Sequence, residues 1–197
     1  MIIDQLKPFF DWLHIHPHLA GFAVFLISLG ESIAIFGLLV PGSVVMTAIG
    51  ALMGAGILPI YPMIAWAITG AILGDVFSFY LGSYFHQKIR NRWPFTHYPQ
   101  VLNKGENFFK KHGGKSVFLG RFAGPIRPVI PLIAGMLNMK PLRFFMADIP
   151  AAIAWAPTYM LPGILLGELS LRLQPEVATQ FLLIIFAGLI FLRKKKA

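Results

Sequence analysis

An acidic residue lies inside one of the most apolar stretches of the chain, and it is the first residue that suggests chemistry. Glu31 follows the uncharged segment 19–30, and no Asp, Glu, Lys, Arg or His occurs from Ser32 to Gly74. A charged side chain at the centre of a lipid bilayer costs at least about 2.5 kcal/mol, so such a carboxylate faces the protein interior, is paired or holds a proton. We therefore predict that Glu31 accepts a proton or a cation. A structural ion pair is the alternative.

Two arginines lie in a second apolar segment, six residues apart. On a straight helix, Arg121 and Arg127 would point in nearly opposite directions, but a break at Pro125 allows them to converge. Two guanidinium groups offer ten N–H donors in rigid forks, which suit the oxygens of a phosphate. We predict that both arginines bind the phosphate of a lipid headgroup. Structural ion pairs with Glu31 and Asp75 are the alternative, and the two roles can coexist.

Two further acidic residues are candidates for supporting roles. Asp75 follows Gly74 in an apolar segment, and we predict that it is a second proton carrier or the partner of an arginine. Because it lies nearer to the end of its segment than Glu31, a solvated or capping role is the alternative. Asp148, beside Pro150, is a weaker candidate of the same kind.

Signatures of enzymes and cofactor sites are missing. The sequence contains no H-E-x-x-H, P-loop or G-x-S-x-G motif and no cysteine. His14, His16 and His18 alternate, but Pro17 interrupts them and no carboxylate or thiolate follows, so we expect no metal site there. We expect the protein to be neither an enzyme nor the carrier of a cofactor.

The composition requires a lipid environment for these residues. Of the 197 residues, 56% are hydrophobic and 13% are charged, against about 25% charged in soluble domains. A soluble fold of this size cannot bury so much apolar surface. Most of the net charge of +9 lies in two basic blocks, Lys88–Lys115 and Arg193–Lys196. Such blocks beside apolar segments indicate the cytoplasmic side of a membrane, and without a nucleic-acid-binding motif we expect no nucleic-acid partner.

The apolar pattern predicts an all-α integral membrane protein. It would contain two opposed re-entrant helical hairpins in an inverted-repeat arrangement, about three spanning helices and an N-terminal interfacial helix. A re-entrant second hairpin places both basic blocks on the cytoplasmic side, whereas a single crossing would not. The predicted segments are an interfacial segment 1–18, a membrane domain 19–168 (hairpin 19–57, span 62–85, basic loop 86–114, hairpin 116–139, span 144–167) and a C-terminal helix with a basic tail, 177–197. We expect the span 144–167 to be interrupted at Asp148, Pro150, Pro157 and Pro162.

These motifs resemble the DedA family of bacterial inner-membrane proteins, whose members share the SNARE-associated or VTT domain. The most specific part is Gly120-Arg121-Phe122-Ala123-Gly124-Pro125-Ile126-Arg127, followed by Pro131 and Ala134-Gly135. Further matches are Glu31 with Pro41-Gly42, and Gly74-Asp75 with Tyr80 and Gly82. One difference is Ser43, where the family often has an acidic residue.

The resemblance implies a fold and a function. It implies two re-entrant hairpins that meet inside the membrane, essential positions at Glu31, Arg121 and Arg127, and supporting positions at Ser43, Pro41, Gly42, Gly120, Pro125 and Pro131. It also implies transport of undecaprenyl phosphate or a phospholipid, which depends on protons and supports recycling of envelope lipids.

We therefore expect a multi-pass protein of the bacterial inner membrane that is a proton-linked translocase or scramblase of an anionic lipid. Loop 86–114 and the C-terminus would be cytoplasmic. The expected partners are the lipid, protons and further copies of the same chain in a homo-oligomer. An antiporter that exchanges small ions or drugs for protons is one alternative. A membrane assembly factor that does not transport, and whose buried charges are structural, is the other.

Overall fold

The fold is taken from a computed structural model of the chain. It describes residues 15, 17–34, 42–85, 88, 96–97 and 99–172. Nearly all of the predicted interfacial segment 1–18, most of 86–98 and the whole predicted C-terminal helix 177–197 lie outside the described residues.

The described part of the chain is helical and contains no strand. The α-helices are α2 (Pro17–Ser32), α3 (Gly42–Gly54), α4 (Ile60–Phe85), α5 (Pro99–His112), α6 (Ser116–Gly120), α7 (Val129–Met136) and α8 (Pro141–Arg172), with short 3-10 helices η2 (Gly113–Lys115) and η3 (Gly124–Ile126).

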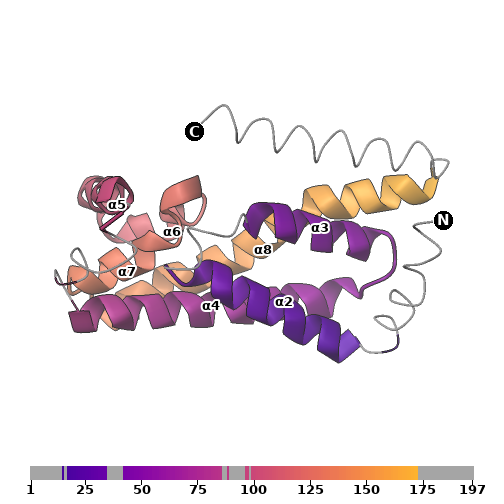
Figure 1. The fold of residues 1–197 in the computed structure, drawn as a ribbon, viewed down its shortest axis with the longest axis horizontal. Helices are drawn as coiled ribbons and strands as arrows, with labels where there is room; N and C mark the ends of the chain where they lie inside the picture. The colour runs from indigo at the N-terminus through magenta and orange to yellow at the C-terminus, as the bar shows by residue number, and fades with distance from the viewer. Residues whose placement is uncertain are drawn as a thin grey trace.

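Two long helices, α4 and α8, run along the length of the molecule (Figure 1). Helices α2 and α3 lie along one half of this pair, and α5, α6 and α7 lie along the other half. Helix α2 packs against α4 and α3 packs against α8, with little contact between α2 and α3 themselves. The end of α2 and the beginning of α3 therefore lie near the middle of the molecule, as do the end of α6 and the beginning of α7.

Glycines let these helices approach closely. A Cβ atom at Gly70 would overlap the backbone of α2 at Phe25, and one at Gly163 would overlap the backbone of α3 at Thr47. Small residues four positions apart, such as Gly163 and Gly167, are typical of helix contacts inside membranes, where packing rather than water exclusion holds helices together. The glycines thus fix α2 on α4 and α3 on α8.

The segment between α6 and α7 turns sharply. Gly124 has a φ of +57°, a left-handed conformation that glycine adopts without the strain a side chain would cause. Gly124 is the first residue of the three-residue helix η3, and after it α7 packs on α4, where Gly135 lies against the backbone at Phe79. The chain therefore turns between α6 and α7 instead of continuing as one helix.

Two sequence predictions need correction. The segment 144–167 was expected to be interrupted at its prolines, but α8 continues for 32 residues through Pro150, Pro157 and Pro162. The segment 86–114 was expected to be a loop, yet its second half forms α5. One face of α5, with Leu102 and Gly105, is buried against α7, which explains why a helix forms there.

The helices differ in whether they are long enough to cross a membrane. Only α4 and α8, among the described helices, are long and apolar enough to cross a membrane. Helix α3 has 13 residues, or about 20 Å at 1.5 Å per residue, against a hydrocarbon core of about 30 Å. Helices α6 and α7 are shorter still.

Candidate functional site

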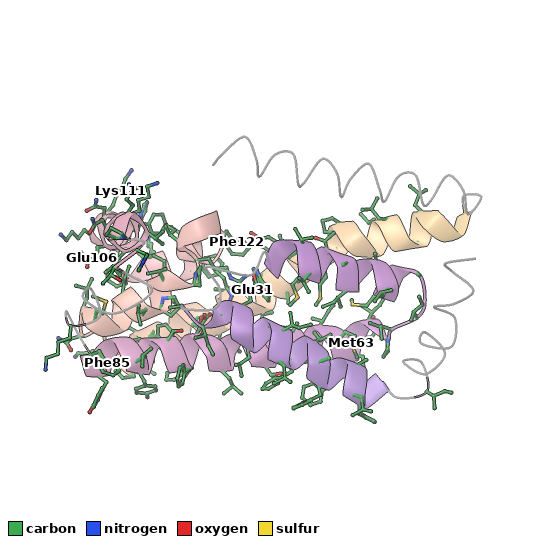
Figure 2. All side chains as sticks on the ribbon, in the orientation of Figure 1. Glu31, Met63, Phe85, Glu106, Lys111 and Phe122 are labelled. Carbon is green, nitrogen blue, oxygen red and sulfur yellow. The ribbon has the colours of Figure 1, made fainter. Side chains whose placement is uncertain are left out.

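The end of α2 is held inside the protein by a serine of α4. The hydroxyl of Ser78 donates to the carbonyl of Ser32 at 3.3 Å and accepts the backbone N–H of Ala34 at 3.1 Å. The last groups of a helix have no partners within the helix, and in a membrane they must find them in the protein. Glu31 lies in this last turn and is 5% exposed, so its carboxylate is fixed near the middle of the molecule (Figure 2).

The second half of the site is a buried arginine between two aspartates. Arg121, at the end of α6, donates from Nη1 to Asp75 of α4, and the same atom donates to Asp148 of α8 at 2.7 Å. All three residues are buried. Asp75 lies in the middle of α4 and not near its end, so the structure contradicts the solvated or capping alternative.

The second arginine pairs with Glu31. Arg127 donates from Nη1 to the Glu31 carboxylate and from Nη2 to the hydroxyl of Ser32 at 3.4 Å. Its guanidinium carbon lies 4.0 Å from the centre of the Trp155 ring, and that of Arg121 lies 5.5 Å from the same centre. Both arginines, six residues apart in the chain, therefore face one indole of α8.

We call Glu31, Asp75, Arg121, Arg127 and Asp148 the central charge cluster. Several of its polar atoms have no hydrogen-bond partner among the described residues; they are Nε and Nη2 of Arg121, Oε2 of Glu31 and Oδ2 of Asp148. Buried polar groups in proteins are usually satisfied, and unsatisfied ones often mark sites of function. The cluster thus has both N–H donors and carboxylate oxygens available to a further group.

The remaining candidates contribute to the backbone around the cluster or cannot be placed. Gly42 lies against Glu31, because a Cβ atom at this position would overlap the carboxyl group. Gly120 packs against Ile130, and Pro131 is buried in α7. Pro41 lies outside the described residues, as do the side chains of Ser43 and Pro125.

Sequence reasoning missed Trp155. Its side chain is fully buried, and its Nε1 has no partner within the described part of the chain. A signal was present, because Trp155 is seven residues after Asp148 and therefore lies on the same face of a continuous helix. The expected interruption of that helix at Pro150 concealed it.

Comparison with known proteins identifies the family. The model of the VTT domain matches residues 40–165. The chain belongs to this family, the DedA family. The resemblance seen in the sequence motifs is thereby confirmed, and the chain is a membrane protein with helices that can span the bilayer.

Relatives of this DedA-family chain are named as membrane proteins. The inner membrane protein YabI of Escherichia coli is 39% identical over 146 residues, which are 74% of this chain and 57% of YabI. A membrane protein of Buchnera aphidicola from Schizaphis graminum is 35% identical over 169 residues, 84% of this chain and 67% of the relative. Protein DedA of Escherichia coli is 28% identical over 170 residues, 80% and 78% of the two chains. No solved structure matches the chain.

The chain spans little more than half the length of the first relatives it matches. The names of these relatives describe membrane proteins and no enzyme activity.

Proposed function

We propose that the protein is a proton-linked translocase or scramblase that moves an anionic lipid, undecaprenyl phosphate or a phospholipid, between the leaflets of the membrane. The observation that carries this proposal is a pair of arginines with carboxylate partners at the middle of a membrane protein, of which Arg121 is buried and has donors without a partner among the described residues. Two guanidinium groups are the natural partners of a phosphate.

The short helices support an arrangement with access from both sides. In our proposal, α2 with α3 and α6 with α7 are re-entrant hairpins that enter from opposite sides and return, while α4 and α8 span. Broken backbone at membrane depth is tolerated only where it is buried in protein or lines a cavity, and transporters bind substrates at such breaks. A phosphate at the arginines would then lie about midway between the leaflets.

The charges of the central charge cluster support a link to protons. Three carboxylates and two guanidinium groups give a formal charge of −1, which one bound proton would neutralise. A phosphate that binds Arg127 competes with Glu31 for the same donors. A buried carboxylate that loses its arginine gains by taking up a proton. Binding of the anionic lipid and binding of a proton therefore favour each other.

The family and the distribution of basic residues support a location and an orientation for the protein. We propose that the protein works in the bacterial inner membrane, with loop 86–114 and the C-terminal basic block on the cytoplasmic side. Moving such a lipid back across this membrane would support recycling of envelope lipids.

The variant Glu31→Gln tests the proton link. Glutamine has nearly the shape of glutamate but cannot change its charge, so lipid movement by this variant is expected to lose its response to an imposed pH gradient. The measurement follows a labelled lipid between the leaflets of liposomes that contain the purified protein, with and without the gradient. Glu168→Gln, at an exposed site near the far end of α8, is the matched control. A Glu31→Gln protein that responds to the gradient as the wild type does would contradict the role of Glu31.

A further inference from the structure

A groove opens on the surface of the half of the molecule that contains α5 and α6. It has a volume of about 890 Å³ and is bordered by the end of α5, by η2, by α6 and by the first two turns of α8. None of the residues of the central charge cluster lines it. The groove is therefore a separate feature of the protein.

One rim of the groove is positively charged. Lys111, Lys115 and Arg143 line it, and its lining contains no acidic residue. In the part of the chain that the structure describes, none of these three side chains forms an ion pair. All three are exposed, and Lys111 points outward from α5 (Figure 2). A smaller hollow of about 320 Å³ shares Arg143 and adds Lys140.

The other wall of the groove is apolar and exposed. Phe118 and Leu119 of α6 are 36% and 43% exposed, and Met146 of α8 is 70% exposed. Large apolar side chains exposed beside cationic ones form the surface that an anionic amphiphile needs, with its charge on the rim and its chains on the wall.

The residues that line the groove lie close in the chain to residues of the central charge cluster. Leu119 is two residues before Arg121 on the same segment, and Ala147, which lines the groove, immediately precedes Asp148. Arg143 and Asp148 are five residues apart on α8, or about 7.5 Å along its axis. A phosphate on the rim would lie about one and a half helical turns from the buried ion pair.

We propose that this groove binds the phosphate-bearing headgroup of an anionic membrane lipid, with Lys111, Lys115 and Arg143 around the phosphate and the lipid chains along Phe118, Leu119 and Met146. The complementary charge and the apolar wall favour a lipid over a soluble anion. This goes beyond the proposed function, because the groove can hold a lipid whether or not the protein moves one. If the protein does move lipids, the groove is where the lipid is loaded.

A label in the groove tests the binding directly. The chain has no cysteine, so Met146→Cys provides a single position for a fluorophore at the apolar wall. The labelled full chain is placed in nanodiscs of phosphatidylcholine that contain a small fraction of brominated phosphatidylglycerol, whose bromine quenches the fluorophore on contact. Half-maximal quenching is expected at a mole fraction about tenfold lower than for brominated phosphatidylcholine, because charge-assisted bonds to the phosphate hold the anionic lipid.

Two matched pairs of substitutions identify the charges responsible. Lys115→Gln with Arg143→Gln removes two charges from the rim and is expected to abolish the preference for the anionic lipid. Lys104→Gln with Lys110→Gln removes two charges from exposed positions of α5 that do not line the groove, and the preference is expected to persist. All four side chains are exposed, so both proteins are expected to fold.

Three outcomes would overturn the proposal. They are no preference for the anionic lipid in the labelled parent protein, an equal loss of preference in both double variants, and displacement of the brominated lipid by glycerol phosphate. The last result would assign the groove to a soluble phosphate compound. Because the label reports only on the groove, these results do not depend on whether the lipid crosses the membrane.

Discussion

Arg127→Lys is expected to reduce lipid translocation by about 100-fold, almost as much as Arg127→Ala. Lysine keeps the positive charge but loses the planar fork and the face that lies on the Trp155 ring. A desolvated cation–π contact is worth about 2 kcal/mol and a hydrogen bond to a charged group about 1.5–3 kcal/mol. Since about 1.4 kcal/mol corresponds to a factor of ten, the combined loss amounts to about two orders of magnitude or more.

The assay compares both variants with the wild type in liposomes that contain equal amounts of folded protein. Lys104→Arg is a suitable control, because this lysine is exposed on α5 and lies outside both the central charge cluster and the groove beside α6. If Arg127→Lys moves lipid at the wild-type rate, a positive charge alone suffices and the proposed guanidinium clamp is wrong.

Arg121→Met is expected to lower the free energy of unfolding by about 3–5 kcal/mol, the cost of removing one partner from a buried ion pair. Asp75 and Asp148 would then face each other without the guanidinium that both contact. The measurement is reversible unfolding in mixed micelles, followed by circular dichroism. An unchanged unfolding free energy would contradict the structural role of Arg121.

A compensated variant separates this structural role from transport. Arg121→Met combined with Asp75→Asn and Asp148→Asn contains no unpaired charge at this site, so we expect most of the stability to return. We expect no return of lipid movement, because a phosphate would find one arginine where it needs two. If both stability and transport returned, the charges would be structural only, as in the alternative of a membrane assembly factor.

The sequence predicted the boundaries of some elements because hydrophobicity determines them. The span 62–85 corresponds to α4, and the break near Pro125 separates α6 from α7. Helix α5 was missed because the many charges of its segment suggested a loop, although Leu102 and Gly105 lie on one face. The continuity of α8 was missed because proline was expected to end a helix, whereas packing against α3 and α4 accommodates it.

The sequence pointed to the individual candidate residues of the site but not to which of them form ion pairs with each other. Glu31 could be recognised because a lone carboxylate in an apolar stretch must be buried or paired. Its partner could not, since Arg127 is 96 positions away in the chain and both arginines were equally suitable. That Asp75 and Asp148 share Arg121 depends on how three segments pack together, and one sequence does not contain that information.

The proposed movement of an anionic lipid across the membrane can be measured directly. The purified wild-type protein is placed in liposomes, and labelled undecaprenyl phosphate and labelled phosphatidylglycerol are followed from one leaflet to the other, with ion flux recorded in parallel. We predict that at least one lipid moves faster than in protein-free liposomes and that an imposed pH gradient changes the rate. Flux of small ions without movement of either lipid would contradict the proposed lipid transport and favour an antiporter. No movement of lipid or ions would favour a structural role.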